Sequence, residues 1–233
     1  QHRWPRPDDR TKLIRIWTGD IEIHITADIA LAVMQYWHVT GDDEFLCIHG
    51  AELVLDGAVF WASAATREPD GRYHFRNVVG PDEYHDRVDD NAYTNQLAAW
   101  HLRTAEGVAS WLADHHPERW AELSAGLGID AAERARWAQV GAAMYLPVGP
   151  DGLLEQFAGY FALTDLDPAE LRDPSRTVSM QQRHGIEGIA LTQVLKQPDV
   201  LMLAYQLPEL FGGDALARNY AYYDPRTDHE HGS

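Results

Sequence analysis

The stretch of this chain best suited to chemistry is a Gly80-Pro81 turn that leads into four titratable side chains: Asp82, Glu83, His85 and Asp86. Loops that Gly and Pro hold on a rigid scaffold commonly present reacting groups. The carboxyl of Glu83 could there protonate a departing group as a general acid. The alternative is that Glu83 is a solvated acid on a purely structural loop.

A second polar group follows directly and has a simpler explanation. Asp89, Asp90 and Asn91 precede a long apolar pattern. Asp and Asn side chains satisfy the free N–H groups in the first turn of a helix. We therefore interpret these three residues as helix caps. Capping does not account for Glu83, because Glu83 lies before the expected start of the helix.

Other short groups could bind a ligand. Lys196-Gln197 stands at the head of an expected helix, where Lys196 could equally be a solvated charge. Trp17 and Asp20 offer aromatic stacking and carboxylate hydrogen bonds, which suit sugars, but a core Trp and a capping Asp fit equally well. Two dipeptides with aromatic side chains either line a pocket or belong to the core: Gln156-Phe157 and Tyr160-Phe161.

The last residues of the chain form a candidate anion site. His231-Gly232-Ser233 joins a Gly, which lets the backbone approach an anion closely, to a Ser hydroxyl. The alternative is a plain polar tail, since terminal residues are often poorly ordered. His229 and His231 also form an H-x-H pair, but no third ligand is evident, so we expect no metal site.

The elements that must position these residues are mostly helices. Apolar spacing and capping residues predict helices over Glu22–Val39, Asp43–Ala65, Asp90–His115, Pro117–Gly126, Asp130–Met144, Gln197–Leu207 and Ala215–Tyr223. Phe45, Ile48, Leu53, Val59 and Phe60 are expected to supply the buried side of the second helix. A few short strands or extended pieces are expected at Lys12–Trp17 and around Pro69-Asp70-Gly71, with an irregular start over Gln1–Arg10. The pattern predicts one all-α domain with long functional loops.

Composition narrows the class of protein further. The chain has 233 residues and a formal net charge of −17, which disfavours nucleic acids and anionic membranes as partners. A single cysteine, Cys47, excludes an internal disulfide. We see no uninterrupted apolar run of about 18 residues and no signal peptide, so we expect a cytoplasmic protein with no membrane span. The chain starts at Gln1 and stops abruptly at Ser233, and we expect it to be a piece of a longer protein.

Five motifs, in the same order along the chain, resemble a known family. They are G-D-I-E-I-H-I-T-A-D-I-A at Gly19–Ala30, G-P-D-E-Y-H with V-D-D-N-A-Y-T-N at Gly80–Asn95, L-L-E-Q-F-A-G-Y-F at Leu153–Phe161, L-K-Q-P-D-V-L at Leu195–Leu201, and Y-Y-D-P-R-T-D-H-E-H-G-S at Tyr222–Ser233. Together they resemble the inverting disaccharide phosphorylases of glycoside hydrolase family 65, which include maltose, trehalose and kojibiose phosphorylases.

The resemblance implies a fold and a place within it. It implies that residues 1–233 form part of an (α/α)6-barrel catalytic domain, with loops at one end of the barrel forming the pocket. The N-terminal β-sandwich of the family, its early barrel helices and its C-terminal parts would lie outside this chain. The resemblance also implies a homodimer for the full-length protein.

The resemblance assigns roles to the candidate residues. Glu83 takes the position of the general acid, and Lys196 and Gln197 take the positions that grip the hydroxyls of the glucosyl unit. His231, Gly232 and Ser233 would bind phosphate, and Trp17 and Asp20 lie where the acceptor-selecting loop ends. Inorganic phosphate would be the co-substrate and nucleophile, a disaccharide the other substrate, and no cofactor is expected.

An acid of this kind should have a raised pKa, which we expect from partial burial of Glu83 beside carboxylates such as Asp82. The products of phosphorolysis would be β-D-glucose 1-phosphate and a free sugar. A hydrolase of the same family, of the acid trehalase or kojibiose-hydrolase type, is the alternative. It would need a second carboxylate about 6.5–9.5 Å from the acid to activate water. A noncatalytic, carbohydrate-binding helical domain is a third hypothesis.

Overall fold

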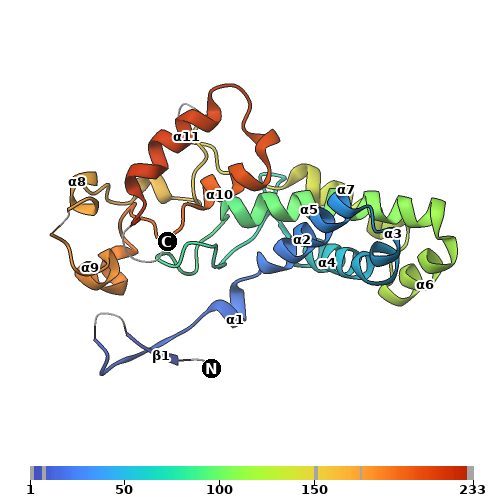
Figure 1. Ribbon diagram of the computed structural model, residues 1–233, viewed down its shortest axis with the longest axis horizontal. Coiled ribbons are helices and arrows are strands. Elements are labelled where there is room, and N and C mark those ends of the chain that lie inside the picture. The colour runs from blue at the N-terminus through green and yellow to red at the C-terminus, as the bar shows by residue number, and fades with distance from the viewer. Residues whose placement is uncertain (1–2, 7–8, 150–151, 174, 230–233) are drawn as a thin grey trace. The chain divides into compact units, whose positions relative to one another are not determined.

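The computed structural model describes residues 3–6, 9–149, 152–173 and 175–229, which fall into two compact units (Figure 1). The first unit contains Gln1–Ile23, Arg76–Tyr93 and Leu146–Ser233, and the second contains His24–Phe75 and Thr94–Tyr145. Helices dominate, and the strands are only two or three residues long. The prediction of a mainly α chain with a few short strands is confirmed.

The first unit consists of short helices joined by long loops. Its elements are β1 (Arg3–Pro5), β2 (Leu13–Arg15), α1 (Thr18–Ile21), η3 (Tyr160–Ala162), α8 (Pro168–Leu171), α9 (Met180–Ile189), α10 (Asp199–Gln206), η4 (Pro208–Leu210), α11 (Ala215–Tyr223) and η5 (Asp224–Arg226). The predicted helices at α10 and α11 are confirmed. The segment that contains α9 showed no clear pattern, and the helix there is kinked at Gly185, where φ is 74°.

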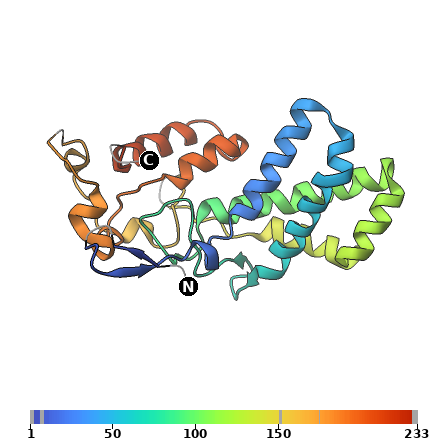
Figure 2. The same ribbon diagram turned by 60° about the horizontal axis from the view of Figure 1, so that its bottom comes forward.

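The start of the chain is more ordered than its Pro-rich sequence indicates. The expectation of an irregular segment is wrong for Arg3–Pro5, because it pairs antiparallel with Leu13–Arg15. The hairpin lies beside α9 (Figure 2), to which the Arg6 guanidinium is joined by two hydrogen bonds of 2.7 and 2.6 Å to the Glu187 carboxylate. Backbone pairing and this ion pair together hold the segment, and neither is visible in local sequence.

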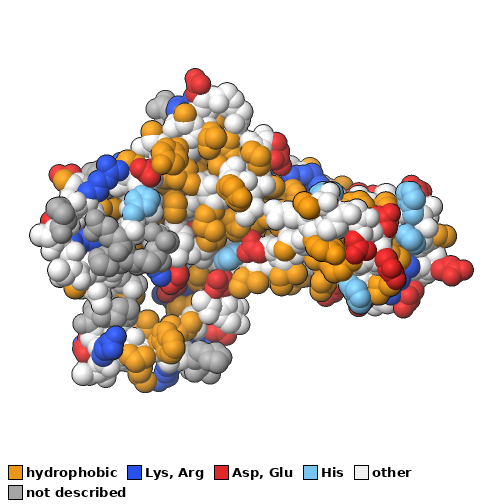
Figure 3. Space-filling view, in the orientation of Figure 1, with side chains coloured by type: hydrophobic (Ala, Val, Ile, Leu, Met, Phe, Trp, Pro, Cys, Tyr) orange, Lys and Arg blue, Asp and Glu red, His pale blue; other side chains and the backbone are white. Residues whose placement is uncertain are grey.

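The second unit is a bundle of longer helices. Its elements are α2 (Ile25–Thr40), α3 (Asp43–Phe45), the π-helical turn η1 (Leu46–Gly50), α4 (Ala51–Ala64), β3 (Thr66–Arg67), β4 (Tyr73–His74), α5 (Ala92–His115, with its first two residues in the first unit), α6 (Pro117–Leu127) and α7 (Ala131–Ala143). All the helices predicted in this region are present. Acidic and histidine side chains mark its surface near α3 and α6 (Figure 3), in keeping with the negative net charge.

The buried face predicted for the helical stretch Asp43–Ala64 is wrong. Ile48, Leu53 and Phe60 are 48, 51 and 37% exposed, whereas the face that contains Val54, Leu55, Ala58 and Trp61 is fully buried. This stretch is apolar around most of its circumference, so apolar spacing cannot select one side. It is also long and apolar enough by composition to cross a membrane, and half of the apolar window is buried inside the structure, as in a core helix.

Close helix packing decides which face of α4 is buried. Gly57 faces the ring of His101 on α5, and a Cβ at Gly57 would lie 2.4 Å from His101 Cε1. His101 cannot easily move, because its Nδ1 accepts from Trp61 Nε1–H at 3.1 Å and its Nε2–H donates to the Val54 carbonyl at 2.8 Å. These two bonds require a neutral ring, and burial lowers the pKa of His101 to about 4.

We predict opposite effects for two Gly→Ala substitutions in helix interiors. Gly57→Ala should lower the free energy of unfolding by about 1–3 kcal/mol, because the new methyl group overpacks the His101 contact. Gly107→Ala on α5 meets open space and should raise it by about 0.5–1 kcal/mol through helix propensity. Urea or thermal unfolding of both variants measures the difference. Equal effects of the two substitutions would show that the close helix approach is not required.

Candidate active site

The Glu83 loop is closed at its base by a backbone bridge. Val78 and Val88 exchange two N–H···O=C hydrogen bonds of 2.9 Å each. Asn77 and Arg87, which flank the bridge, have positive φ angles of 55° and 57°. Non-glycine residues adopt this conformation only where surrounding contacts impose it, and such strain gathers at functional sites. The loop is therefore held in one conformation.

A buried carboxylate joins this loop to the Lys196-Gln197 segment. Asp82 is 2% exposed, and its Oδ1 accepts from the backbone N–H groups of Lys196 at 2.9 Å and Gln197 at 3.3 Å. It also accepts from the N–H of Tyr84 at 3.3 Å. Charged acceptors make stronger hydrogen bonds than neutral ones, so Asp82 fixes two distant parts of the chain side by side.

The Glu83 side chain then meets Lys196 and Gln197 directly. Lys196 Nζ lies 2.8 Å from Glu83 Oε2, and Gln197 Nε2–H donates to Glu83 Oε1 at 3.1 Å. The backbone N–H of Glu83 donates in return to Gln197 Oε1 at 3.2 Å. Three residues predicted separately from sequence thus form one contacting group.

The expected partial burial of Glu83 is wrong. Its side chain is 61% exposed and that of Lys196 is 22% exposed. The buried position belongs to its neighbour Asp82, whose carboxylate is turned inward to the backbone and to His85. Because adjacent loop residues point in different directions, burying Asp82 leaves the Glu83 carboxyl at the surface of a cleft, where a ligand can reach it.

His85 completes the support beneath Glu83. Its Nδ1 lies 2.6 Å from Asp82 Oδ2 and its Nε2 lies 2.9 Å from the Thr192 carbonyl oxygen. Both partners accept hydrogen bonds, so both ring nitrogens carry protons and the imidazole is charged. Burial alone would lower the pKa of His85, but the hydrogen bond and the charge of Asp82 outweigh burial, and the net shift raises the pKa above 6.5.

A second layer of buried polar groups lies behind the loop. Asn91 Nδ2–H donates to Asp199 Oδ2 at 2.6 Å, and Gln156 Nε2–H donates to the Gln197 carbonyl at 3.2 Å. Burial and the charge of Asp82 raise the pKa of Asp199 well above its usual range, which favours the protonated carboxyl. A Cβ at Gly80 would lie 2.3 Å from Asn91 Nδ2 and 2.5 Å from Asp199 Oδ2, so only glycine fits there.

Asp89, Asp90 and Asn91, which we interpret as caps of α5, also bond other parts of the chain. Asp89 Oδ1 accepts from the backbone N–H of Asn77 at 2.9 Å, and Asp90 forms an ion pair with Arg76. Asn91 bonds Asp199, as described above. These side chains tie the start of α5 to the Glu83 loop and to α10. Residues at a helix start can thus serve tertiary contacts as well as the helix itself.

Glu83 opens onto a cleft of about 780 Å³ within the first unit. Trp17 lies in the same cleft, with the guanidinium carbons of Arg15 and Arg87 over its ring at 4.0 and 5.1 Å from the centroid. Protein groups thus already occupy part of the Trp17 π surface. Asp20 is exposed and does not line the cleft, but it bonds two residues that do: its carboxylate pairs with Arg15 at 2.8 Å and its backbone N–H donates to the Trp17 carbonyl at 2.8 Å.

Some of the remaining candidate residues are buried in the core, and others lie outside the described residues. Phe157 and Tyr160 are buried and pack against the ring of His85, with centroids 5.1 and 6.2 Å away, so they support the site from within. His231, Gly232 and Ser233 lie outside the described residues. His229 Nε2 lies 3.3 Å from Asp224 Oδ1. Across the described part of the chain, no group of three His, Cys, Asp or Glu residues is arranged to hold a metal ion.

Several supporting residues were not identified as functional from sequence. Asp82 was considered only as a charged neighbour of Glu83, and His85, Asp199 and Asn91 were assigned no such role. The sequence contains one local signal of their role: more polar residues follow the Gly80-Pro81 turn than the cap of the next helix requires. The contacts that join the two halves of the site are distant in sequence: His85 with the Thr192 carbonyl, Asn91 with Asp199 and Asp82 with the Lys196 N–H are 107, 108 and 114 positions apart.

Comparison with known proteins identifies the family of this chain. Residues 7–233 match the family model of the glycosyl hydrolase family 65 central catalytic domain. The chain is 39% identical over 220 residues to a kojibiose phosphorylase from Thermoanaerobacter brockii, covering 93% of this chain and 28% of that protein. It is 38% identical over 221 residues to a 1,2-alpha-glucosylglycerol phosphorylase from Bacillus selenitireducens, again covering 93% and 28%.

A solved structure shows the same relationship in space. A putative kojibiose phosphorylase from the human microbiome matches with a TM-score of 0.76 and 26% identity, covering 88% of this chain and 28% of that one. The chain therefore belongs to the central catalytic domain family of glycosyl hydrolase family 65. It is all-α and part of an (α/α)6 barrel, as its motifs implied. It spans about 28% of the length of the curated relatives described above.

We predict that the pKa of His85 lies above its ordinary value of 6.5 and that Asp82 is the cause. Deuterium exchange at the histidine C2 position, followed by mass spectrometry over a pH series, should give a midpoint above 6.5 for His85, with neutral His101 as the internal control. Asp82→Asn should lower the His85 midpoint and leave that of His101 unchanged. A His85 midpoint at or below 6.5 in the unsubstituted protein would contradict the charged ring.

The same shift predicts how local stability depends on pH. The folded pKa of His85 lies above its unfolded value of 6.5, so its stabilising contribution is complete below pH 6.5 and is lost as pH rises through the folded pKa. Amide exchange in the Glu83 loop should therefore speed up, beyond its intrinsic pH dependence, above that pKa. Asp82→Asn should abolish the extra pH dependence.

Proposed function

We propose that the full-length protein containing this chain catalyses inverting phosphorolysis of an α-glucosyl disaccharide. Glu83 protonates the departing sugar oxygen, and inorganic phosphate attacks the anomeric carbon from the opposite face. The products are β-D-glucose 1-phosphate and a free sugar. The named relatives described above are phosphorylases of α-glucosyl compounds, which supports this reaction class.

The observation that carries the proposal is the contact between Glu83 and Lys196-Gln197. The Glu83 carboxyl is 61% exposed on a rigid loop and contacts the Lys196 ammonium and the Gln197 amide. These three polar groups together can bind a polar ligand. Lys196 and Gln197 carry donors that suit sugar hydroxyls, so the donor glucosyl unit would lie against them. Phosphate is already anionic, so this mechanism requires no second carboxylate as a base.

We place the remaining parts by the same reasoning. His231, Gly232 and Ser233 would cradle the phosphate, because Gly and Ser supply the close backbone approach and the hydroxyl that an anion site requires. Trp17 and Asp20 would face the acceptor sugar at the other side of the cleft. Residues 1–233 would contribute to a single catalytic domain.

Inverting hydrolysis is the second candidate function. Besides Glu83, the carboxylates of Glu22, Asp86 and Glu187 line the cleft, and a suitably placed carboxylate could activate water in place of phosphate. The two reactions differ in their need for phosphate and in their products.

We predict that product formation depends on phosphate. The full-length protein, incubated with α-1,1-, α-1,2-, α-1,3- and α-1,4-linked glucosyl disaccharides, should release β-D-glucose 1-phosphate only when phosphate is present. Glucose alone, formed at the same rate with and without phosphate, would establish the hydrolase instead. Absence of any turnover, with retained disaccharide binding, would establish a binding module.

We predict that Glu83→Gln lowers kcat by about 100- to 10,000-fold, the range typical of a lost general acid. The amide keeps the size of the side chain but has no proton to give. Steady-state kinetics with the disaccharide and phosphate measures the loss. Glu44→Gln, at an exposed residue of α3, is the matched control and should leave kcat unchanged. Equal activity of the two variants would remove Glu83 from the mechanism.

A further inference from the structure

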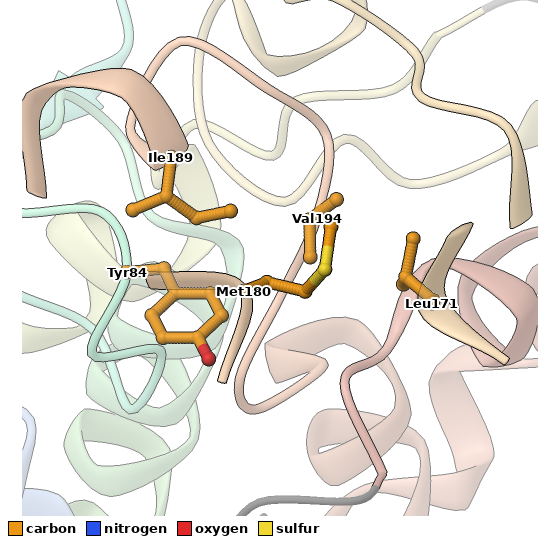
Figure 4. Close-up of a cluster of buried hydrophobic side chains, with 5 residues drawn as sticks. All are labelled: Tyr84, Leu171, Met180, Ile189 and Val194. Atoms are coloured by element: carbon orange, nitrogen blue, oxygen red, sulfur yellow. The ribbon is translucent and has the colours of Figure 1, made fainter. Parts of the chain in front are cut away.

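Tyr84, which directly follows the proposed acid, is held at both ends of its side chain. Its ring is buried in an apolar cluster with Leu171, Met180, Ile189 and Val194 (Figure 4). Its hydroxyl donates to Asp228 Oδ2 at 2.9 Å. Tyr84 is one peptide bond from Glu83, so fixing Tyr84 restricts where the Glu83 side chain begins.

Asp228 is the centre of this arrangement. Its Oδ2 also accepts from the backbone N–H of Met180 at 3.1 Å, and its Oδ1 accepts from Arg176 Nη2–H at 2.6 Å. Burial would raise the pKa of Asp228, but the bonds from Arg176, Met180 and Tyr84 outweigh it and lower the pKa. Asp228 therefore remains a charged acceptor, and it joins three segments of the first unit.

Arg176 pairs with Asp228 in the interior rather than at the surface. The side chains of Arg176 and Asp228 are 2% and 0% exposed. Arg176 also donates to the carbonyls of Val178 at 3.1 Å and Leu171 at 3.0 Å. Further hydrogen bonds of this kind offset part of the desolvation cost of a buried ion pair. Tyr84 links this buried pair to Glu83, its neighbour in the chain.

We propose a positioning network, formed by Tyr84, Asp228 and Arg176, that holds the Glu83 carboxyl in the orientation required to protonate the departing oxygen; this inference rests on the proposed function. Asp228 also directly precedes His229 and the chain that leads to the proposed phosphate residues. One buried carboxylate would thus place the proton donor relative to that part of the chain. A proton donor misplaced by about 1 Å can cost about 100-fold in rate.

Tyr84→Phe tests the network, because it deletes only the hydroxyl and keeps the buried ring. In the full-length protein, kcat for disaccharide phosphorolysis should fall by about 10- to 100-fold, with KM changed by no more than about twofold. The second substrate is α-D-glucosyl fluoride, whose fluoride departs without a proton from the enzyme. Its phosphorolysis should remain within about twofold of the unsubstituted protein. The ratio of the disaccharide rate to the fluoride rate therefore measures how well Glu83 is placed to donate its proton. It should shift in the same direction as in Glu83→Gln.

Tyr223→Phe is the matched control. Tyr223 is fully buried in the same unit, and its hydroxyl donates to the Leu154 carbonyl, away from the Glu83 loop. It should lose comparable thermal stability without changing the ratio of disaccharide to fluoride rates. Asp228→Asn keeps the shape of the side chain. The molecules of this variant that fold should show the same change in the ratio of disaccharide to fluoride rates as Tyr84→Phe.

An unchanged ratio in Tyr84→Phe would overturn the network, whether both rates are kept or both fall together. The proposed function is judged separately, by the phosphate dependence of the unsubstituted protein. If that protein proves to be a hydrolase, the same ratio measured with water as the nucleophile still tests the network.

Discussion

The site depends on one buried carboxylate that accepts backbone hydrogen bonds from a distant segment. Asp82 is bonded to the N–H groups of Lys196 and Gln197, and this contact fixes their backbone beneath the direct contacts that their side chains make with Glu83. Its other oxygen holds His85, which in turn reaches the Thr192 carbonyl. A single ionised side chain thus sets the register between two loops that no regular secondary structure joins.

Two buried histidines show how partners, rather than burial, set charge. The ring of His101 accepts one hydrogen bond from Trp61 and donates one to a carbonyl, so it is neutral and burial lowers its pKa. The ring of His85 faces a carboxylate and a carbonyl, so it must donate twice and its pKa is raised. The first histidine lets two helices pack closely, whereas the second neutralises the charge of Asp82 beneath the active loop.

The chain separates reactive groups from the groups that position them. Glu83 and Lys196 are accessible to a ligand, whereas the side chains of Asp82, Asp199 and Asp228 are buried and bond other parts of the protein. Most of the buried polar residues in the first unit belong to loops, which need side-chain hydrogen bonds to replace those of helices and sheets. This explains why a region with so few long elements still holds a defined site, and why Gly80 has no room for a side chain.

Apolar spacing and turn residues by themselves determined most helices, the hairpin around Pro69-Asp70-Gly71 and the candidacy of Glu83, because these depend on neighbours within a few positions. They could not select the buried face of an all-round apolar helix such as α4. Nor could they show that Asp90 pairs with Arg76 and that Asn91 bonds Asp199. Only the tertiary structure decided those points, together with the burial of Asp82 and the exposure of Glu83, because each depends on hydrogen-bond partners or packing surfaces that other segments of the chain supply.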